Sequence, residues 1–136
     1  MNNRRFAVSV HILILLQQAQ GSYVSSSYLA GSININPVLV RKELINLRKH
    51  GFVQAREGKN GGAALAKPAA DIRLADVYHA VREKNILGEN RTEPNPKCPV
   101  GKQINGHLEE VYHSAEQALV RQLESETLAS FSKRFT

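Results

Sequence analysis

The sequence predicts a mainly α-helical protein with one small β-hairpin and a long C-terminal helix. Three observations point to this fold class. Apolar residues recur at helical spacing through the first 50 residues, the pattern changes to short alternating segments within residues 52–67, and a helical repeat returns after Pro99. With 136 residues, 42% of them hydrophobic, the chain can bury one substantial core but not two.

Residues 4–19 predict a first helix that is apolar on more than one face. Such a helix contacts two different surfaces, one of which can belong to a partner subunit. Arg4 and Arg5 before the apolar run imitate a secretory signal peptide, but Ser9 and His11 interrupt the run. The run is also shorter than the roughly 20 apolar residues that span a bilayer. We therefore expect a buried helix and no membrane association.

Two further helices with a tight connection are expected next. The serines at positions 25–27 offer N-cap hydroxyls for a short helix ending near Ile33, and Asn34 can take the left-handed conformation that ends it. Asn36 as N-cap and Pro37 as first helical residue then begin a helix that runs to about His50. Its buried stripe is expected to be Val40, Leu44 and Leu47, and its outer face Val38, Arg41, Lys42, Ile45, Asn46 and Lys49.

Residues 52–67 predict a β-hairpin around the glycine-rich tip at 57–62. A short helix is expected over residues 74–81, where apolar residues return to helical spacing. Glycine and prolines make residues 84–98 an irregular connector.

From Pro99 onward the apolar stripe is helical and can continue to Phe131. A helix of nearly 30 residues is about 45 Å long, which exceeds what a domain of this size can cover. A second copy of the chain is the symmetric way to cover the remainder, so we expect a homodimer. The expected organisation is a helix-turn-helix domain at 1–83, a connector at 84–98, and a dimerisation helix with its tail at 99–136.

The excess positive charge lies entirely in the N-terminal half of the chain. Residues 1–70 carry nine Lys and Arg against two acidic residues, whereas residues 71–136 carry nine against ten. Phosphate binding requires such asymmetry. Together with the helix pair and the hairpin as a wing, it predicts a winged helix-turn-helix that binds double-stranded DNA, with the second helix in the major groove. The alternatives are a merely solvated basic surface and a winged-helix module that binds another, acidic protein.

The predicted DNA-binding residues are Arg5, Ser26, Asn36, Val38, Arg41, Lys42, Lys49, Arg56, Lys59 and Asn60. Arg41 and Lys42 lie in the second turn of the predicted recognition helix, where an arginine can hold guanine with two hydrogen bonds. The three hairpin residues suit backbone or minor-groove contacts. Ser26 can donate to a phosphate, although helix capping explains the serines more fully.

Cys98 is the only cysteine, which excludes an intrachain disulfide and favours a reducing, cytoplasmic compartment. Pro99 after it is suited to the first position of a helix, and the helix dipole and Lys97 would both favour the thiolate. A redox-sensing cysteine is one interpretation and an ordinary loop cysteine is the other. The histidine spacing offers no metal site, and no base is positioned for a thiol enzyme, so we expect no cofactor, no metal and no catalytic residues.

Together these motifs resemble the Rrf2 family of bacterial repressors, of the IscR, NsrR and CymR type. The carrying segments are 36–53, the glycine-rich wing, 72–81 and 95–102, the last resembling the YwnA branch in particular. The resemblance covers nearly the whole chain and implies a dimeric winged helix-turn-helix repressor with the long helix as its dimer element. Iron-sulfur members hold their cluster with three connector cysteines, so the single Cys98 implies no cluster. They also place an arginine where this chain has Glu57, which implies a different operator.

Overall fold

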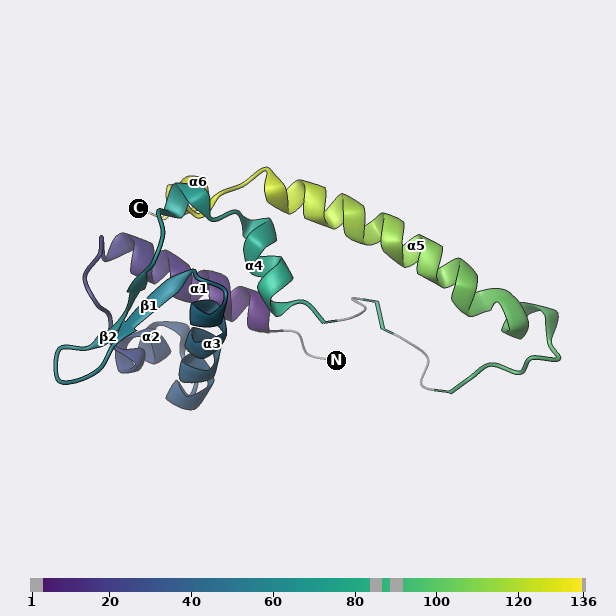
Figure 1. Ribbon diagram of the computed structural model, residues 1–136, viewed down its shortest axis with the longest axis horizontal. Coiled ribbons are helices and arrows are strands. Elements are labelled where there is room, and N and C mark those ends of the chain that lie inside the picture. Colours follow the sequence, from purple (N-terminus) through teal and green to yellow (C-terminus); the bar gives the residue numbers. More distant parts are fainter. Residues whose placement is uncertain (1–3, 84–86, 89–91, 136) are drawn as a thin grey trace.

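The computed structural model describes residues 4–83, 87–88 and 92–135, and in these ranges the chain folds into helices and one antiparallel hairpin (Figure 1). In chain order the elements are α1 (Arg5–Gln18), α2 (Ser26–Ile33), α3 (Pro37–Lys49), β1 (Val53–Arg56), β2 (Gly62–Leu65), the short 3-10 helix η1 (Ala69–Asp71), α4 (Leu74–Val81), α5 (Pro99–Glu124) and α6 (Leu128–Ser132). The predicted fold class, mainly α with one small β-hairpin, is confirmed.

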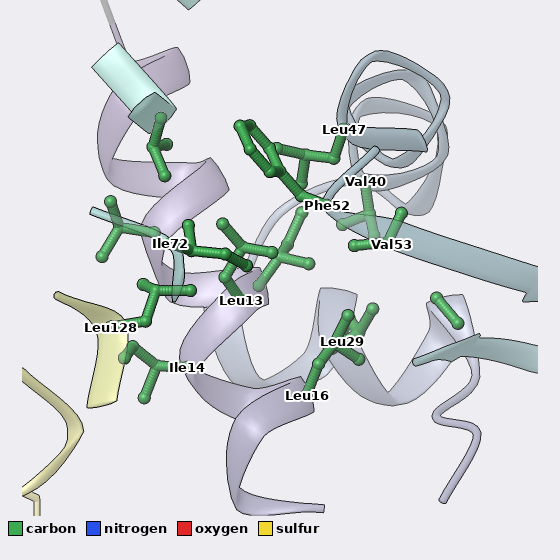
Figure 2. Packing of buried hydrophobic residues seen from close by; sticks show 14 of the residues in the cluster. Leu13, Ile14, Leu16, Leu29, Val40, Leu47, Phe52, Val53, Ile72 and Leu128 are labelled. Atoms are coloured by element: carbon green, nitrogen blue, oxygen red, sulfur yellow. The ribbon is translucent and has the colours of Figure 1, made fainter. Parts of the chain in front are cut away.

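The core is built around α1, as the apolar character of that helix on several faces predicts. Ile12 and Leu13 are completely buried, and α1 contacts α2, α3, α4, α6 and β2. Figure 2 shows Leu13, Leu29 and Leu47 converging from α1, α2 and α3 on one apolar cluster. Burial of each such side chain contributes about 1.5–3 kcal/mol. The cluster therefore fixes the positions of α2 and α3 relative to α1.

The helix pair begins and ends where the sequence predicts. The hydroxyl of Ser25 accepts a hydrogen bond from the backbone N–H of Tyr28 at 3.1 Å, and Asn34 has the left-handed backbone that ends α2. Asn36 caps α3 by accepting from the N–H of Val38 at 2.9 Å. These local interactions set the tight turn between the helices, so that α3 is held beside α2.

A third segment extends the hairpin. β1 and β2 pair from Val53 opposite Leu65 to Arg56 opposite Gly62, and Val24 exchanges two backbone hydrogen bonds with Ala63 on the other side of β2. A Cβ atom on Gly62 would lie 2.2 Å from the carbonyl oxygen of Val24, so only glycine fits there. The loop before α2 therefore anchors the hairpin to the helix pair.

The expectation that the last helix continues to Phe131 is wrong. α5 ends at Glu124, and Thr127 begins α6 through reciprocal hydrogen bonds with Ser130. The physical reason for the break is burial, because Leu128 is fully buried and its N–H donates to the carbonyl of Ile72 at 2.8 Å. The C-terminal residues that the structure describes thus return to the core and pack on α1 and η1.

α5 extends away from the rest of the molecule (Figure 1). It contacts α4, where Glu116 accepts hydrogen bonds from the Tyr78 hydroxyl at 3.2 Å and from Arg82. Burial and the neighbouring carboxylate together raise the pKa of Tyr78. None of the 26 residues of α5, all of which the structure describes, is buried. Most of the predicted stripe is exposed, including Val100 and Val111.

The connector is described at residues 87–88 and 92–98, which form no helix or strand. The parts of the predicted connector at 84–86 and 89–91 lie outside the described residues. Within the described ranges, no helix has the length and apolar character needed to cross a bilayer.

Candidate nucleic-acid interface

The outer face of α3 carries four of the predicted DNA-binding side chains. Val38, Arg41, Lys42 and Lys49 are all exposed, while Val40 and Leu47 on the opposite face are completely buried. The cap at Asn36 places its own exposed side chain at the start of the same helix. The structure therefore brings these predicted residues together on one surface.

Asn46 is the exception on this helix. The sequence assigns it to the outer face, but its side-chain amide donates a hydrogen bond to the carbonyl of Ala80 at 3.0 Å. That carbonyl lies near the end of α4, so Asn46 joins α3 to α4 rather than facing outward. Sequence spacing alone cannot distinguish these two positions, because Asn46 lies at the boundary between the two faces of the helix.

Arg5 lies in an ion pair and not on the exposed face of α3. Its guanidinium holds both carboxylate oxygens of Glu43, with Nε 2.9 Å from Oε2 and Nη2 3.1 Å from Oε1. The side chain of Glu43 is only 8% exposed, whereas that of Arg5 is 39% exposed. This hydrogen bonding raises the pKa of Arg5 further above its usual range. Its charge is therefore committed to neutralising a buried carboxylate on the inner side of α3.

The strands of the hairpin, and not its polar tip, line the groove beside α3. Arg56 lies over the ring of Tyr23, with its guanidinium carbon 4.2 Å from the ring centroid, and donates to the carbonyl of Asn60 at 3.0 Å. These contacts hold the side chain of Arg56 along the hairpin. Lys59 and Asn60 are exposed at the tip, beside Glu57.

A groove of about 180 Å³ separates α3 from the hairpin. Its lining residues are Ser26, Arg41, Leu44, Ile45, Arg48, Val53, Ala55, Gly62 and Ala63. Two of them are arginines seven residues apart, which a helix places on one line. The structure thereby brings predicted Ser26 and Arg41 together and adds Arg48, which the sequence reasoning left out of the interface. The sequence does contain a signal for Arg48, because its seven-residue spacing from Arg41 places both arginines on the same face of the helix.

Cys98 is the N-cap of α5 and is exposed. The backbone N–H groups of Gly101 and Val100 lower the pKa of its thiol below the usual value. Gly101 permits a close approach here, because a Cβ on it would lie 2.6 Å from the carbonyl oxygen of Asn95. The structure thus places an accessible thiol at the N-terminus of the long helix, far along the chain from the α3 surface.

The chain matches known regulators over most of its length. It matches the Rrf2 family, described as "Iron-dependent Transcriptional regulator", over residues 2–134. It is 41% identical over 128 residues to YwnA of Bacillus subtilis, assigned as an HTH-type transcriptional regulator, and the alignment covers 94% of both chains. The expected resemblance to this family and to its YwnA branch is confirmed.

Solved structures agree with this result. A protein assigned to DNA binding is 38% identical, with a TM-score of 0.75 and coverage of 93% of this chain and 97% of that one. CymR, the global cysteine regulator of B. subtilis, has a TM-score of 0.71 at 20% identity, with coverage of 100% and 98%. At that identity the likeness supports the fold alone. The winged-helix layout with a long C-terminal helix is confirmed.

The family description raises the question of whether this chain fits an iron centre. Iron and iron-sulfur centres need several convergent sulfur, nitrogen or oxygen donors. The sequence has one cysteine, and over residues 4–83, 87–88 and 92–135 no three His, Cys, Asp or Glu side chains come together in a way that could hold a metal ion. The described residues of a single chain therefore do not fit such a centre.

Proposed function

Because this chain belongs to the Rrf2 family of transcriptional regulators, we propose that it binds double-stranded DNA as a homodimer and represses transcription at a pseudo-palindromic operator. The observation that carries the proposal is the exposed cationic face of α3, which is supported from behind by completely buried Val40 and Leu47, while Leu44 of the predicted stripe is only partly buried. A recognition helix needs both features, since the stripe fixes the helix and the cations meet phosphates and base edges. The proposed place of action is the cytoplasm.

The proposed dimer element is α5. It is 26 residues long, about 39 Å, and among the described residues none of its apolar side chains is buried, while several, such as Val111, are exposed. Pairing of two such helices would bury the stripe that includes Ile104, Val111 and Leu119, and would carry two copies of α3 in a two-fold arrangement. Two recognition helices then enter successive major grooves about 34 Å apart. A dimer bound in this way covers the operator and blocks access to it.

The wing supplies backbone contacts in this proposal. Lys59 and Asn60 are exposed at the hairpin tip, and the groove beside α3 holds Ser26, Arg41 and Arg48. Cations of this kind neutralise phosphates and release counterions. Arg5 is left out of the contact set, because Glu43 holds its guanidinium.

Substitution of Arg41 and Lys42 by alanine together tests the recognition surface. Both side chains are exposed, so the variant should keep its thermal unfolding midpoint while losing operator binding in a gel-shift assay. Arg134→Ala, far from α3, is the matched control. Retained affinity in the double variant would contradict the assignment.

Salt dependence separates this function from a winged-helix module that binds an acidic protein. DNA binding should weaken log-linearly with salt, with a slope set by the number of phosphates contacted. The double variant should have a shallower slope. If the protein has no affinity for any DNA fragment, or if its binding does not depend on salt, the protein-binding alternative would be favoured.

We also propose that Cys98 makes the regulator responsive to oxidants. Its thiolate attacks the O–O bond of a peroxide, takes one oxygen as a sulfenic acid and releases hydroxide, which is protonated to water. With diamide, two thiols lose two electrons and two protons to the reagent and form a disulfide between subunits. Either product alters the start of α5 and hence the spacing of the two DNA-binding heads.

Cys98→Ser tests the switch. Wild-type protein treated with peroxide or diamide should change its operator affinity, while the serine variant should not respond. An equal response of the two proteins would remove Cys98 from the account.

A further inference from the structure

The outer face of α3 has an apolar centre that phosphate binding does not explain. Ile45 is 70% exposed, more than any other large hydrophobic side chain that the structure describes, and Val38 is 58% exposed. Large apolar side chains gathered on an exposed surface mark contact sites. On a helix whose other outward side chains are mostly charged, they call for a specific partner group.

The two side chains lie on one line of the helix. Seven residues separate Val38 from Ile45, which is about two turns. Arg41 and Arg48 fall together to one side of this line, where both line the groove facing the hairpin, and Lys42 falls to the other side. We call Val38 and Ile45 the apolar ridge of α3. It is thus bordered by cations on both sides.

This arrangement matches the major groove of DNA more closely than a protein or a lipid surface. The bordering cations require an anion on either side, which the two phosphate backbones supply. Between the backbones, the floor of the groove exposes one apolar substituent, the C5 methyl group of thymine. Two turns of helix span about 10 Å, close to three base-pair steps of about 3.4 Å.

We propose that Val38 and Ile45 read thymine methyl groups, so that each operator half-site carries two thymines about three base pairs apart. Arg41 and Arg48 on the hairpin side and Lys42 on the opposite side position the ridge by holding the backbones. This inference rests on the proposed DNA-binding function and adds the base class that the helix selects.

Deoxyuridine substitution tests the proposal because it removes only the methyl group. Genomic fragments bound by the purified dimer are sequenced to define the operator, and the thymines of each half-site are replaced by deoxyuridine in turn. Affinity is measured by fluorescence anisotropy at fixed salt. Loss of one buried methyl contact should weaken binding about fourfold, and loss in both half-sites by about an order of magnitude. Replacement of thymines outside the half-sites should have no effect.

Variants assign each methyl group to a side chain. Ile45→Ala should weaken binding to the thymine operator, and this variant should bind the thymine operator and the operator with deoxyuridine at that position with equal affinity. Val38→Ala should show the same loss of discrimination at a second position. Leu39→Ala is the matched control, since Leu39 is 44% exposed on the same helix but lies off the ridge. It should keep the full thymine preference.

Three results would overturn the proposal: equal affinity of wild-type protein for thymine and deoxyuridine operators, half-sites without thymine, or an Ile45→Ala variant that still discriminates at every position. Those results leave DNA binding itself intact. Absence of any bound fragment would instead overturn the proposed function together with this inference.

Discussion

The N-terminal body, which consists of α1 to α4 with the hairpin, differs from α5 in how its apolar residues are covered. In the body, α1 is packed on several sides and side chains such as Leu13 and Leu29 are completely buried. In α5 no residue is buried, although Val100 and Val111 are as apolar as those of the core. The body therefore buries its own apolar residues within one chain, whereas α5 does not, and in the proposed dimer a second copy of the chain would cover it.

The largest effect should come from removing apolar volume in the body. Leu13→Ala should lower the free energy of unfolding by about 2–5 kcal/mol, because it leaves a cavity beside α2 and α3. Val111→Ala removes a smaller and exposed side chain, and in dilute monomer should cost less than about 0.5 kcal/mol. Urea denaturation at low protein concentration measures both. Equal losses of unfolding free energy in the two variants would mean that α5 and the body do not differ in this way.

Leu128→Ala asks whether α6 belongs to the body. Leu128 is fully buried and its segment is hydrogen-bonded to Ile72, so the loss should be about 2–4 kcal/mol. Leu119→Ala at an exposed site of α5 is the control. A negligible loss for Leu128→Ala would mean that the tail does not help to close the core.

The ion pair under α3 should have a smaller effect. Arg5→Met leaves the carboxylate of Glu43 buried without its partner and should cost roughly 2–3 kcal/mol, less than for a fully buried pair because Arg5 is partly exposed. Adding Glu43→Leu should recover most of the lost stability, and it should also recover any operator affinity that Arg5→Met loses through displacement of α3. A double variant no more stable than Arg5→Met would show that the pair is not coupled.

A charge placed on α5 tests whether this helix forms the proposed dimer interface. Val111→Asp should shift the monomer–dimer equilibrium by at least tenfold, because it puts a carboxylate into the proposed apolar interface. The monomer should remain folded by circular dichroism, since Val111 is exposed there. Sedimentation velocity over a concentration series measures the shift. An unchanged distribution would mean that α5 does not form the interface.

The smallest effect concerns Cys98 at the start of α5. Its backbone contacts lower the pKa of the thiol, so the thiolate persists to lower pH than in an ordinary cysteine. Alkylation by iodoacetamide, followed against pH by mass spectrometry, should therefore have its midpoint below that of the same peptide unfolded in urea. Coinciding midpoints would remove the activating effect of the helix N-terminus.

What the sequence predicts well is local. Asn34 sets the end of α2 and Asn36 the start of α3 through their own backbone and side-chain preferences, and the structure places both where they are expected. What it misses joins distant residues. Arg5 and Glu43 are 38 positions apart, and neither composition nor periodicity shows that an arginine in α1 neutralises a carboxylate in α3.

The end of α5 was missed for a different reason. The apolar repeat runs on through Leu123 to Leu128, which hides the break from a periodicity argument. Thr127 and Ser130 form reciprocal caps that begin a new helix, a signal that three-residue spacing could have revealed. For the interface, the groove that places Ser26 beside Arg41 and Arg48 could not be predicted, because it depends on the position of the hairpin relative to α3.

In the proposed complex, two copies of the α3 surface lie against one duplex. Hydroxyl-radical footprinting of the dimer on its selected operator tests it most directly. We expect two protected patches on one face of the DNA, with centres about 10 base pairs apart. Protection should disappear from both when Arg41 and Lys42 are replaced. A single patch, or protection that persists without those two side chains, would contradict this arrangement of two α3 surfaces on one duplex.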